Sequence, residues 1–287
     1  MIIDSHVHLY PPDVVEDWEK IAEKEPYFKL LCSWKVHKWA VAEDLFEMMA
    51  SDGIDQCWAT SFAFRDPGLC RHCNDYVIDT MARSGGRVQG LAVVNPLSRD
   101  FEKEILRCRE AGFIGVGELF PDGQVFDITD KRQTWRLAAT CQDAGMFLLL
   151  HTAEQVGHDY PGKGKAGPTE AAAFCLNHPG LAVVFAHMGG GLWQYEMMPE
   201  MRIYLQNAWY DMAAVPFLYE ASVFRAVFAA GVGHKILYGS DFPLLGMKRY
   251  RRMLDEAGLD PADEGMFLGG NAGEVIRRAG LFSSAGA

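Results

Sequence analysis

The sequence predicts an α/β protein of the (β/α)8 barrel class, in which eight parallel strands close into a ring inside a layer of helices. Three observations predict this fold: eight apolar runs of strand length recur along 287 residues, amphipathic stretches separate them, and polar residues gather where the strands end. A doubly wound open sheet would also satisfy the alternation. We favour the closed barrel because barrel active sites are built at the carboxyl ends of many different strands.

The predicted strands are short apolar runs, and some, such as Phe147–Leu150, are apolar throughout, which indicates a sheet buried on both faces. In chain order they are Met1–Leu9, Gln56–Ala63, Val88–Asn95, Ile114–Phe120, Met146–Thr152, Ala182–His187, Ala208–Met212 and Lys235–Gly239.

The predicted helices between the strands carry apolar residues at helical spacing. They are Ala42–Ala50, Asn74–Arg83, Phe101–Ala111, Gln133–Asp143, Thr169–Asn177, Tyr195–Gln206 and Leu218–Ala230. A glycine that suits a left-handed helix end follows several helical stretches. These glycines are Gly53, Gly112, Gly145, Gly231 and Gly258.

Two segments fall outside the repeat, within what we expect to be one domain over residues 1–287. Pro11–Ala40 is a long connection rich in tryptophan and tyrosine, and we expect a helical insertion that serves as a lid over the barrel mouth. Asp260–Gly280 contains a final apolar helix that we expect to pack against the barrel.

Composition narrows the class of protein. A formal charge of -11 argues against a nucleic-acid partner, because phosphate binding needs a surplus of lysine and arginine. Seven cysteines are an odd number, which fits reduced thiols better than disulfides, and Cys70–Cys73 is a single C-x-x-C pair that only weakly suggests zinc. Neither a signal peptide nor an uncharged run of about 20 residues is visible, so we expect a cytoplasmic protein without a membrane partner.

His6 and His8 open the chain within its first predicted strand. Successive side chains of a strand alternate between its faces, so these two imidazoles project from the same side and can hold one metal ion. Imidazole is a good ligand for zinc, nickel, iron and manganese. The alternative is that one histidine is exposed and the other caps a turn.

Four further residues stand at the carboxyl ends of other predicted strands, and in a closed barrel these ends surround one rim. They are Glu118, His151, His187 and Asp241. Each could have a structural role alone, because a single strand histidine more often bonds to backbone. Four histidines and two acids buried together would carry large uncompensated desolvation costs without a metal. We therefore predict a metal centre formed by all six residues.

The remaining histidines are weaker candidates. His178 and His234 precede strands, at the end of the barrel that serves stability, and His37 and His72 lie in predicted loops. His158 follows the fifth strand in a glycine-rich loop at the rim, which makes it a candidate for substrate contact. Arg65 and Trp193 are further candidates, since both lie near predicted rim loops. Arg71 and Lys163 are also basic residues on predicted rim loops.

The combination of His-x-His on strand one, an acid on strand four, histidines after strands five and six, and an aspartate after strand eight resembles the amidohydrolase superfamily. Ile-Asp-Ser-His-Val-His, His-Met-Gly-Gly-Gly and Tyr-Gly-Ser-Asp-Phe-Pro resemble its amidohydrolase-related branch, which also contains decarboxylases. The resemblance implies that His6, His8, His151 and Asp241 bind the catalytic metal, which we expect to be zinc. His187 would then bind a second metal or act as an acid or base.

Glu118 departs from the pattern of those decarboxylases and resembles the carboxylate that bridges two metals in TatD-like hydrolases. One or two ions per chain therefore remain open. The resemblance also implies a small-molecule substrate, and homodimers are common among such proteins.

Hydrolysis of a small ester, lactone or amide is the activity that these residues favour, because a bound divalent ion lowers the pKa of water towards ~7. Asp241 would accept the proton of that water, and His187 is the second candidate catalytic group. Two alternatives stay open: non-oxidative decarboxylation of an aromatic or unsaturated acid with a single metal, and a barrel that binds metal or ligand without turnover.

Overall fold

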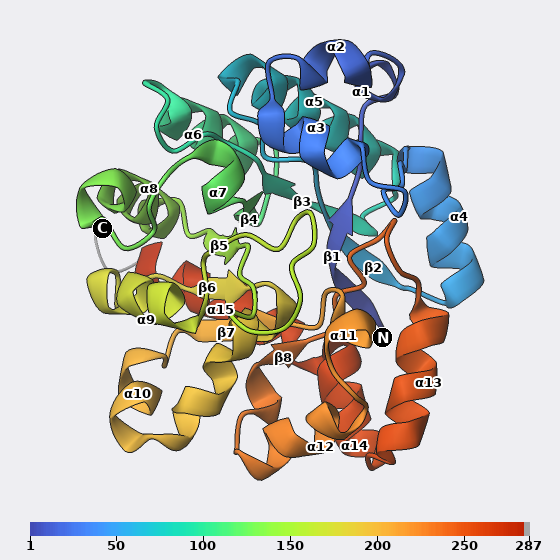
Figure 1. The fold of residues 1–287 in the computed structure, drawn as a ribbon, viewed down its shortest axis with the longest axis vertical. Coiled ribbons are helices and arrows are strands. Elements are labelled where there is room, and N and C mark those ends of the chain that lie inside the picture. The colour runs from blue at the N-terminus through green and yellow to red at the C-terminus, as the bar shows by residue number, and fades with distance from the viewer. Residues whose placement is uncertain (284–287) are drawn as a thin grey trace.

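The structure, a computed structural model, describes residues 1–283 and has eight parallel strands at its centre with helices around them (Figure 1). The strands are β1 (Ile3–His8), β2 (Gln56–Thr60), β3 (Val88–Ala92), β4 (Gly115–Leu119), β5 (Phe147–Leu150), β6 (Val183–Phe185), β7 (Ala208–Asp211) and β8 (Ile236–Leu237). Each pairs with the next in parallel, in chain order.

Backbone hydrogen bonds between β1 and the residues that follow β8 close the ring. Ser5 N donates to Tyr238 O at 2.8 Å, and Asp241 N donates to His6 O at 3.0 Å. His8 N donates to the carbonyl of the residue after Asp241 at 2.7 Å. The predicted (β/α)8 barrel is therefore confirmed, and its closure brings the first strand next to the eighth.

Helices of different lengths connect the strands. They are α1 (Pro12–Glu16), α2 (Trp18–Ala22), α3 (Pro26–Cys32), α4 (Ala42–Asp52), α5 (Pro67–Arg83), α6 (Phe101–Glu110), α7 (Pro121–Gln124), α8 (Lys131–Asp143), α9 (Pro168–Asn177), α10 (Pro199–Tyr204), α11 (Val215–Leu218), α12 (Ser222–Ala229), α13 (Met247–Ala257), α14 (Pro261–Gly265) and α15 (Ala272–Ser283). Two further elements are 3-10 helices, η1 (His187–Met197) and η2 (Gly233–Lys235), and one is a short π-helix, η3 (Met266–Gly270).

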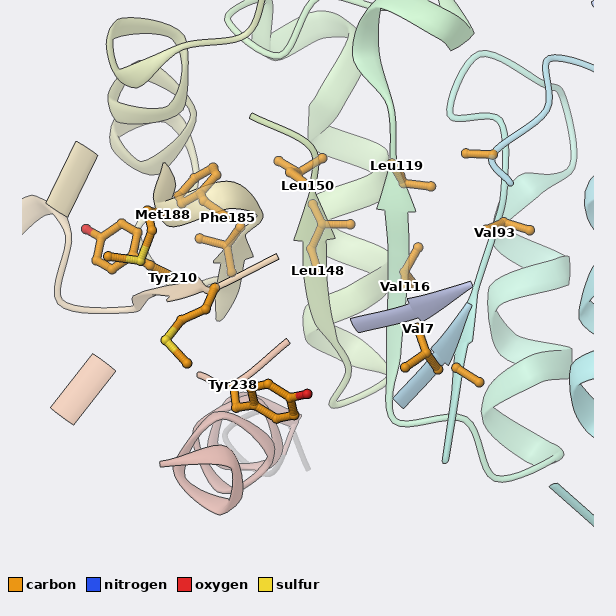
Figure 2. Packing of buried hydrophobic residues seen from close by; sticks show 14 of the residues in the cluster. Val7, Val93, Val116, Leu119, Leu148, Leu150, Phe185, Met188, Tyr210 and Tyr238 are labelled. Carbon is orange, nitrogen blue, oxygen red and sulfur yellow. The ribbon is translucent and has the colours of Figure 1, made fainter. Parts of the chain in front are cut away.

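Two apolar layers lie on the two faces of the strands. Figure 2 shows Leu148 and Leu150 of β5 beside Val116 and Leu119 of β4, in the layer between strands and helices. The intervening Leu149 belongs to the second layer, which fills the barrel interior and continues into α15 at Ala272, Val275 and Ala279. This alternation confirms that the sheet is buried on both faces, and that the last helix packs against the barrel.

Two predicted helices are wrong as continuous elements. The stretch predicted as Tyr195–Gln206 is split, because a proline at 199 disfavours helical backbone at the preceding residue, and Met198 is extended with φ -84° and ψ 121°. The stretch predicted as Leu218–Ala230 is interrupted at Tyr219, which is extended with φ -134° and ψ 157°. The five predicted helix-ending glycines all have positive φ, as expected.

The connection after β1 contains three short helices, α1 to α3, where the sequence predicts a helical insertion; the role of this insertion as a lid stays a prediction. Glu25 is buried between α2 and α3 and accepts hydrogen bonds from Arg65 N at 3.1 Å and Asp66 N at 2.8 Å. Asp13 of α1 pairs with His72 of α5 at 2.9 Å, and Figure 1 shows α1 to α3 in front of α5. The insertion is therefore anchored to the connection that follows β2.

All seven cysteines are free thiols, and Cys70 of the C-x-x-C pair donates to a backbone carbonyl at 3.2 Å. Across residues 1–283, the helices lack the combination of length and apolar character that crossing a bilayer requires.

Candidate metal centre

The carboxyl ends of the strands bring all six predicted metal ligands to one place. They form two groups, and within each group the three potential ligand atoms lie within 4.8 Å of one another. The first group is His6, His8 and Asp241, and the second is Glu118, His151 and His187.

The first group joins β1 to the residues after β8. The Nε2 atoms of His6 and His8 are 3.0 Å apart, and Asp241 Oδ1 lies 3.4 Å from His8 Nε2 and 3.9 Å from His6 Nε2. The backbone of Asp241 is left-handed, with φ 60°, an uncommon conformation that recurs at functional sites.

The second group joins β4, β5 and β6. His151 Nδ1 and His187 Nε2 are 3.2 Å apart, and Glu118 Oε1 lies 3.0 Å from the former and 3.6 Å from the latter. His187 also has left-handed backbone, with φ 56°, and begins the run that continues through Gly191.

Glu118 lies between the two groups. Its Oε2 atom is 3.5 Å from the Nε2 atoms of both His6 and His8, whereas its Oε1 atom faces His151 and His187. Each carboxylate oxygen therefore faces a different group, as in a carboxylate that bridges two cations.

Gly117 makes the position of Glu118 attainable. Its φ is 127°, and a Cβ atom there would overlap the carbonyl oxygen of Leu149 on the neighbouring strand. Thr60 Oγ1 then accepts a hydrogen bond from Glu118 N at 3.1 Å and holds the backbone from the other side. A larger residue at 117 would displace the glutamate.

Each imidazole except that of His8 has a partner on its far nitrogen. His6 Nδ1 lies 2.8 Å from Asp211 Oδ2, His187 Nδ1 lies 2.9 Å from Ala213 O, and His151 Nε2 lies 3.0 Å from Lys163 O. Such partners fix which nitrogen is left to bind a metal.

Sequence reasoning missed Asp211. It stands at the carboxyl end of β7, which is the same criterion that selected Glu118 on β4, so a signal was present in the predicted strand Ala208–Met212.

Strong electrostatic coupling marks the site. Burial lowers the pKa of His6, but Asp211 and Glu118 raise it more, so it lies well above the ordinary value. Burial likewise opposes the effect of the Glu118 and Asp241 carboxylates on His187, whose pKa is raised to about 9.

The carboxylates shift in the opposite direction. Burial raises the pKa of Glu118, yet His6 and His151 bring it well below its usual range, and His8 and His6 outweigh burial to lower the pKa of Asp241 to about 2. Because a metal must displace protons from the imidazoles, its affinity falls as pH falls.

The donor set fits divalent cations that accept nitrogen and oxygen ligands, zinc and manganese among them. Ligands at ~2.1 Å from a tetrahedral ion lie roughly 3.4 Å from one another. The ligand atoms of both groups already have separations near this value, so little rearrangement would be needed.

A cavity opens onto both groups and is walled mainly by apolar and aromatic side chains. Trp34, His37 and Lys38 of the segment after α3 line one side, and Tyr160 and Gly162 of the connection after β5 line another. The two segments meet where the Trp34 and Tyr160 rings stack, with centroids 6.4 Å apart.

The three side chains that the sequence suggests for substrate contact lie outside this lining. His158 and Arg65 are exposed on loops, and Trp193 is buried in the outer apolar layer. Lys163 holds its own loop, because its Nζ donates to Val156 O at 3.0 Å and His158 O at 3.1 Å.

Comparison with known proteins identifies a family and several solved structures of the same fold. Residues 3–278 match the family model described as amidohydrolase. A search of curated proteins gives no match.

Solved structures with the same fold include three enzymes with low sequence identity. The first is 5-carboxyvanillate decarboxylase from Sphingomonas paucimobilis, with 16% identity over 96% of this chain and 98% of that one and a TM-score of 0.74. The second is dihydroxybenzoic acid decarboxylase from Polaromonas sp. JS666 with bound manganese, with 15% identity over 96% of each chain and a TM-score of 0.72. The third is a probable 2-pyrone-4,6-dicarboxylic acid hydrolase from Acinetobacter baumannii, with 14% identity over 96% of this chain and 99% of that one and a TM-score of 0.62.

Proposed function

The chain belongs to the amidohydrolase family, whose members are metal-dependent enzymes, and from this premise we propose that it hydrolyses a small ester, lactone or amide with two divalent cations. The observation that carries the proposal is the place of Glu118, with one oxygen towards His6 and His8 and the other towards His151 and His187.

The grouping of His151 favours two cations over one. A single-cation centre of the kind that the resemblance implied would combine His151 with His6, His8 and Asp241. Instead, His151 Nδ1 lies closest to Glu118 and His187, so His151 completes a second three-ligand group.

A bound divalent cation lowers the pKa of water from ~15.7 towards ~7 and polarises a carbonyl oxygen. Asp241, which belongs to the first group and to the cavity lining, would accept a proton from the attacking water and return it to the leaving group. The aromatic walls, with Phe62 and Phe120 among them, limit the access of bulk water and favour a small, partly apolar substrate.

We propose zinc as the natural cation, because four imidazoles and two carboxylates are ligand types that zinc prefers. A solved structure of the same fold contains manganese, so manganese is the alternative to compare. Seven free thiols favour a reducing compartment such as the cytoplasm, and the cavity favours a small-molecule substrate over a macromolecule.

Metal stoichiometry tests the proposal. We expect two ions per chain in the wild type and one in Glu118→Gln, measured by elemental analysis after reconstitution with Zn²⁺ or Mn²⁺. Glu200→Gln, an exposed carboxylate outside the site, is the matched control and should keep two.

A substrate panel separates hydrolysis from the lyase alternative. The wild type should cleave at least one small ester, lactone or amide, and Glu118→Gln should lose most of that activity. One ion per chain together with carbon dioxide release from an aromatic acid, and no hydrolysis, would overturn the proposal in favour of the decarboxylase.

A further inference from the structure

Asp211 contacts one histidine of each metal-binding group, the ring of His6 and the backbone N–H of His187, but lies outside the cavity lining. It is the last residue of β7 and is fully buried. From its contacts we infer that Asp211 is a positioning residue, which couples the two groups by fixing the nitrogen that His6 and His187 present to a cation. This inference rests on the proposed two-cation site.

The carboxylate divides its oxygens between the groups. Oδ2 accepts from His6 Nδ1 at 2.8 Å, and Oδ1 accepts from the backbone N–H groups of His187 at 3.0 Å and Ala213 at 2.9 Å. Both oxygens therefore have partners. Oδ2 contacts the first metal-binding group, and Oδ1 contacts the second.

A closed ring of hydrogen bonds extends this hold to the side chain of His187. Ala213, which donates to Asp211, accepts in turn from His187 Nδ1 at 2.9 Å through its carbonyl oxygen. Asp211 thus holds the His187 backbone directly and its ring through Ala213.

The consequence is a defined tautomer for both rings. Since Nδ1–H of His6 and of His187 donates away from the centre, Nε2 is the ring atom that faces Glu118 and that can give its lone pair to a cation once it loses its proton. By contrast, His8 Nδ1 is buried without a partner, so its ring is not fixed in this way.

Asp211→Asn should change the contact with the His6 ring and keep the contacts with the backbone N–H groups of His187 and Ala213. The two backbone N–H groups keep the amide oxygen, so the amide nitrogen must face His6 Nδ1. That ring nitrogen then has to accept, its proton moves to Nε2, and Nε2 no longer binds a cation. The same tautomer argument explains the effect of an aspartate-to-asparagine change in serine proteases.

Titration of the metal-free protein with Co²⁺, followed by its visible absorption, tests the inference. We expect two tight sites in the wild type. In Asp211→Asn, the affinity of one site should fall about 10- to 100-fold while the other is kept. In Asp211→Ala, both should weaken, because the hold on His187 is lost as well.

Asp66→Asn is the matched control, because Asp66 also accepts from a backbone N–H, at 2.9 Å, but contacts none of the six metal ligands. Thermal unfolding establishes that each variant is folded. Two sites of wild-type affinity and unchanged cobalt absorption in Asp211→Asn would overturn the inference.

A wild type with one tight site would overturn the two-cation proposal instead. In that event the inference about Asp211 is still tested, by whether Asp211→Asn weakens that single site and changes its cobalt absorption.

Discussion

Two buried clusters of ionisable residues lie in this molecule, and they are built in different ways. At the rim, the carboxylates of Glu118, Asp211 and Asp241 face four imidazoles. In the outer layer, Glu196 faces Lys235 and Tyr210. Both clusters are shielded from water, so the difference between them does not come from burial.

In the outer cluster, each charged or polar side chain has a hydrogen-bond partner within the protein. Lys235 Nζ donates to both Glu196 oxygens, at 3.0 and 2.8 Å, and to Leu205 O at 2.8 Å. Tyr210 Oη donates to Glu196 Oε1 at 2.7 Å. One cation, one anion and one hydroxyl thus complete a closed arrangement that leaves no ligand position free.

The rim cluster leaves its acceptors facing one another. The carboxylate oxygens of Glu118 and Asp241 and the Nε2 atoms of His6 and His8 converge on one space. Lys38 lines the same cavity, but its Nζ donates to Leu244 O at 3.1 Å. A mobile cation from solution can complete this cluster, whereas it could not enter the outer one. Buried ligand atoms that converge on an open space therefore indicate function more than burial itself does.

The two clusters also differ in backbone conformation. Among residues 1–283, the non-glycine residues with positive φ are Val125, His187, Met188, Ala214 and Asp241. Four of these five, all except Val125, are metal-site residues or lie within three residues of His187 or Asp211. Such conformations cost about 1–3 kcal/mol each and persist where the surroundings determine them, as at functional sites.

The largest effect should come from Asp241→Asn, which breaks the rim cluster. Loss of a ligand and of the proton acceptor should lower kcat/KM about 10²–10⁴-fold on the best substrate of the panel. Circular dichroism should show an unchanged fold. Wild-type turnover would contradict the role given to Asp241.

Lys235→Met should break the outer cluster with the opposite outcome. The buried Glu196 carboxylate would lose its counter-charge, which costs about 3–5 kcal/mol of the free energy of unfolding. Urea denaturation measures this loss, and kcat of the remaining folded protein should not change.

The double variant Glu196→Gln/Lys235→Met is the control for this change, since it leaves no unpaired charge. It should recover part of the lost stability. A lower kcat in Lys235→Met would show that the two clusters are coupled.

Metal removal should affect the rim cluster alone. A cation at 100 times its Kd stabilises the native state by about 2.7 kcal/mol, so a chelator should lower the free energy of unfolding by an amount of this order. The same decrease should appear in Lys235→Met, because distant sites contribute additively. Chelation without any effect on thermal or urea unfolding would argue against a bound cation.

The smallest effect should come from His178, at the opposite end of the barrel, where its Nε2 lies 2.8 Å from Thr134 Oγ1. Burial, with help from Lys131, lowers the pKa of His178 to about 4. The unfolded chain, with a histidine pKa near ~6.5, binds more protons between these values, so stability falls as pH falls from ~6.5 to 4.

His178→Gln should remove about 1 kcal/mol of this pH dependence, since the ring keeps partial contact with solvent. Comparing urea denaturation of the wild type and the variant at pH 7 and pH 4.5 isolates the contribution. Equal pH dependence in both proteins would contradict it.

The spacing of apolar residues along the sequence predicted most of the fold. Alternation of apolar strands with amphipathic helices predicted the barrel, because each pattern matches one way of burying apolar surface. The same frame placed Glu118, His151, His187 and Asp241 near His6 and His8, since all parallel strands of a barrel end at one rim. The two broken helices show where a proline or an extended residue overrides such a pattern locally.

The sequence alone thus determined the barrel and the six residues that meet at its rim, because both depend only on strand order and spacing. Tertiary structure alone decided how those residues divide into two groups around Glu118, that Asp211 holds His6 and His187, and that Lys163 and Trp193 are occupied elsewhere. These features depend on side-chain direction and loop path, which are set by contacts between residues far apart in the chain and leave no local pattern.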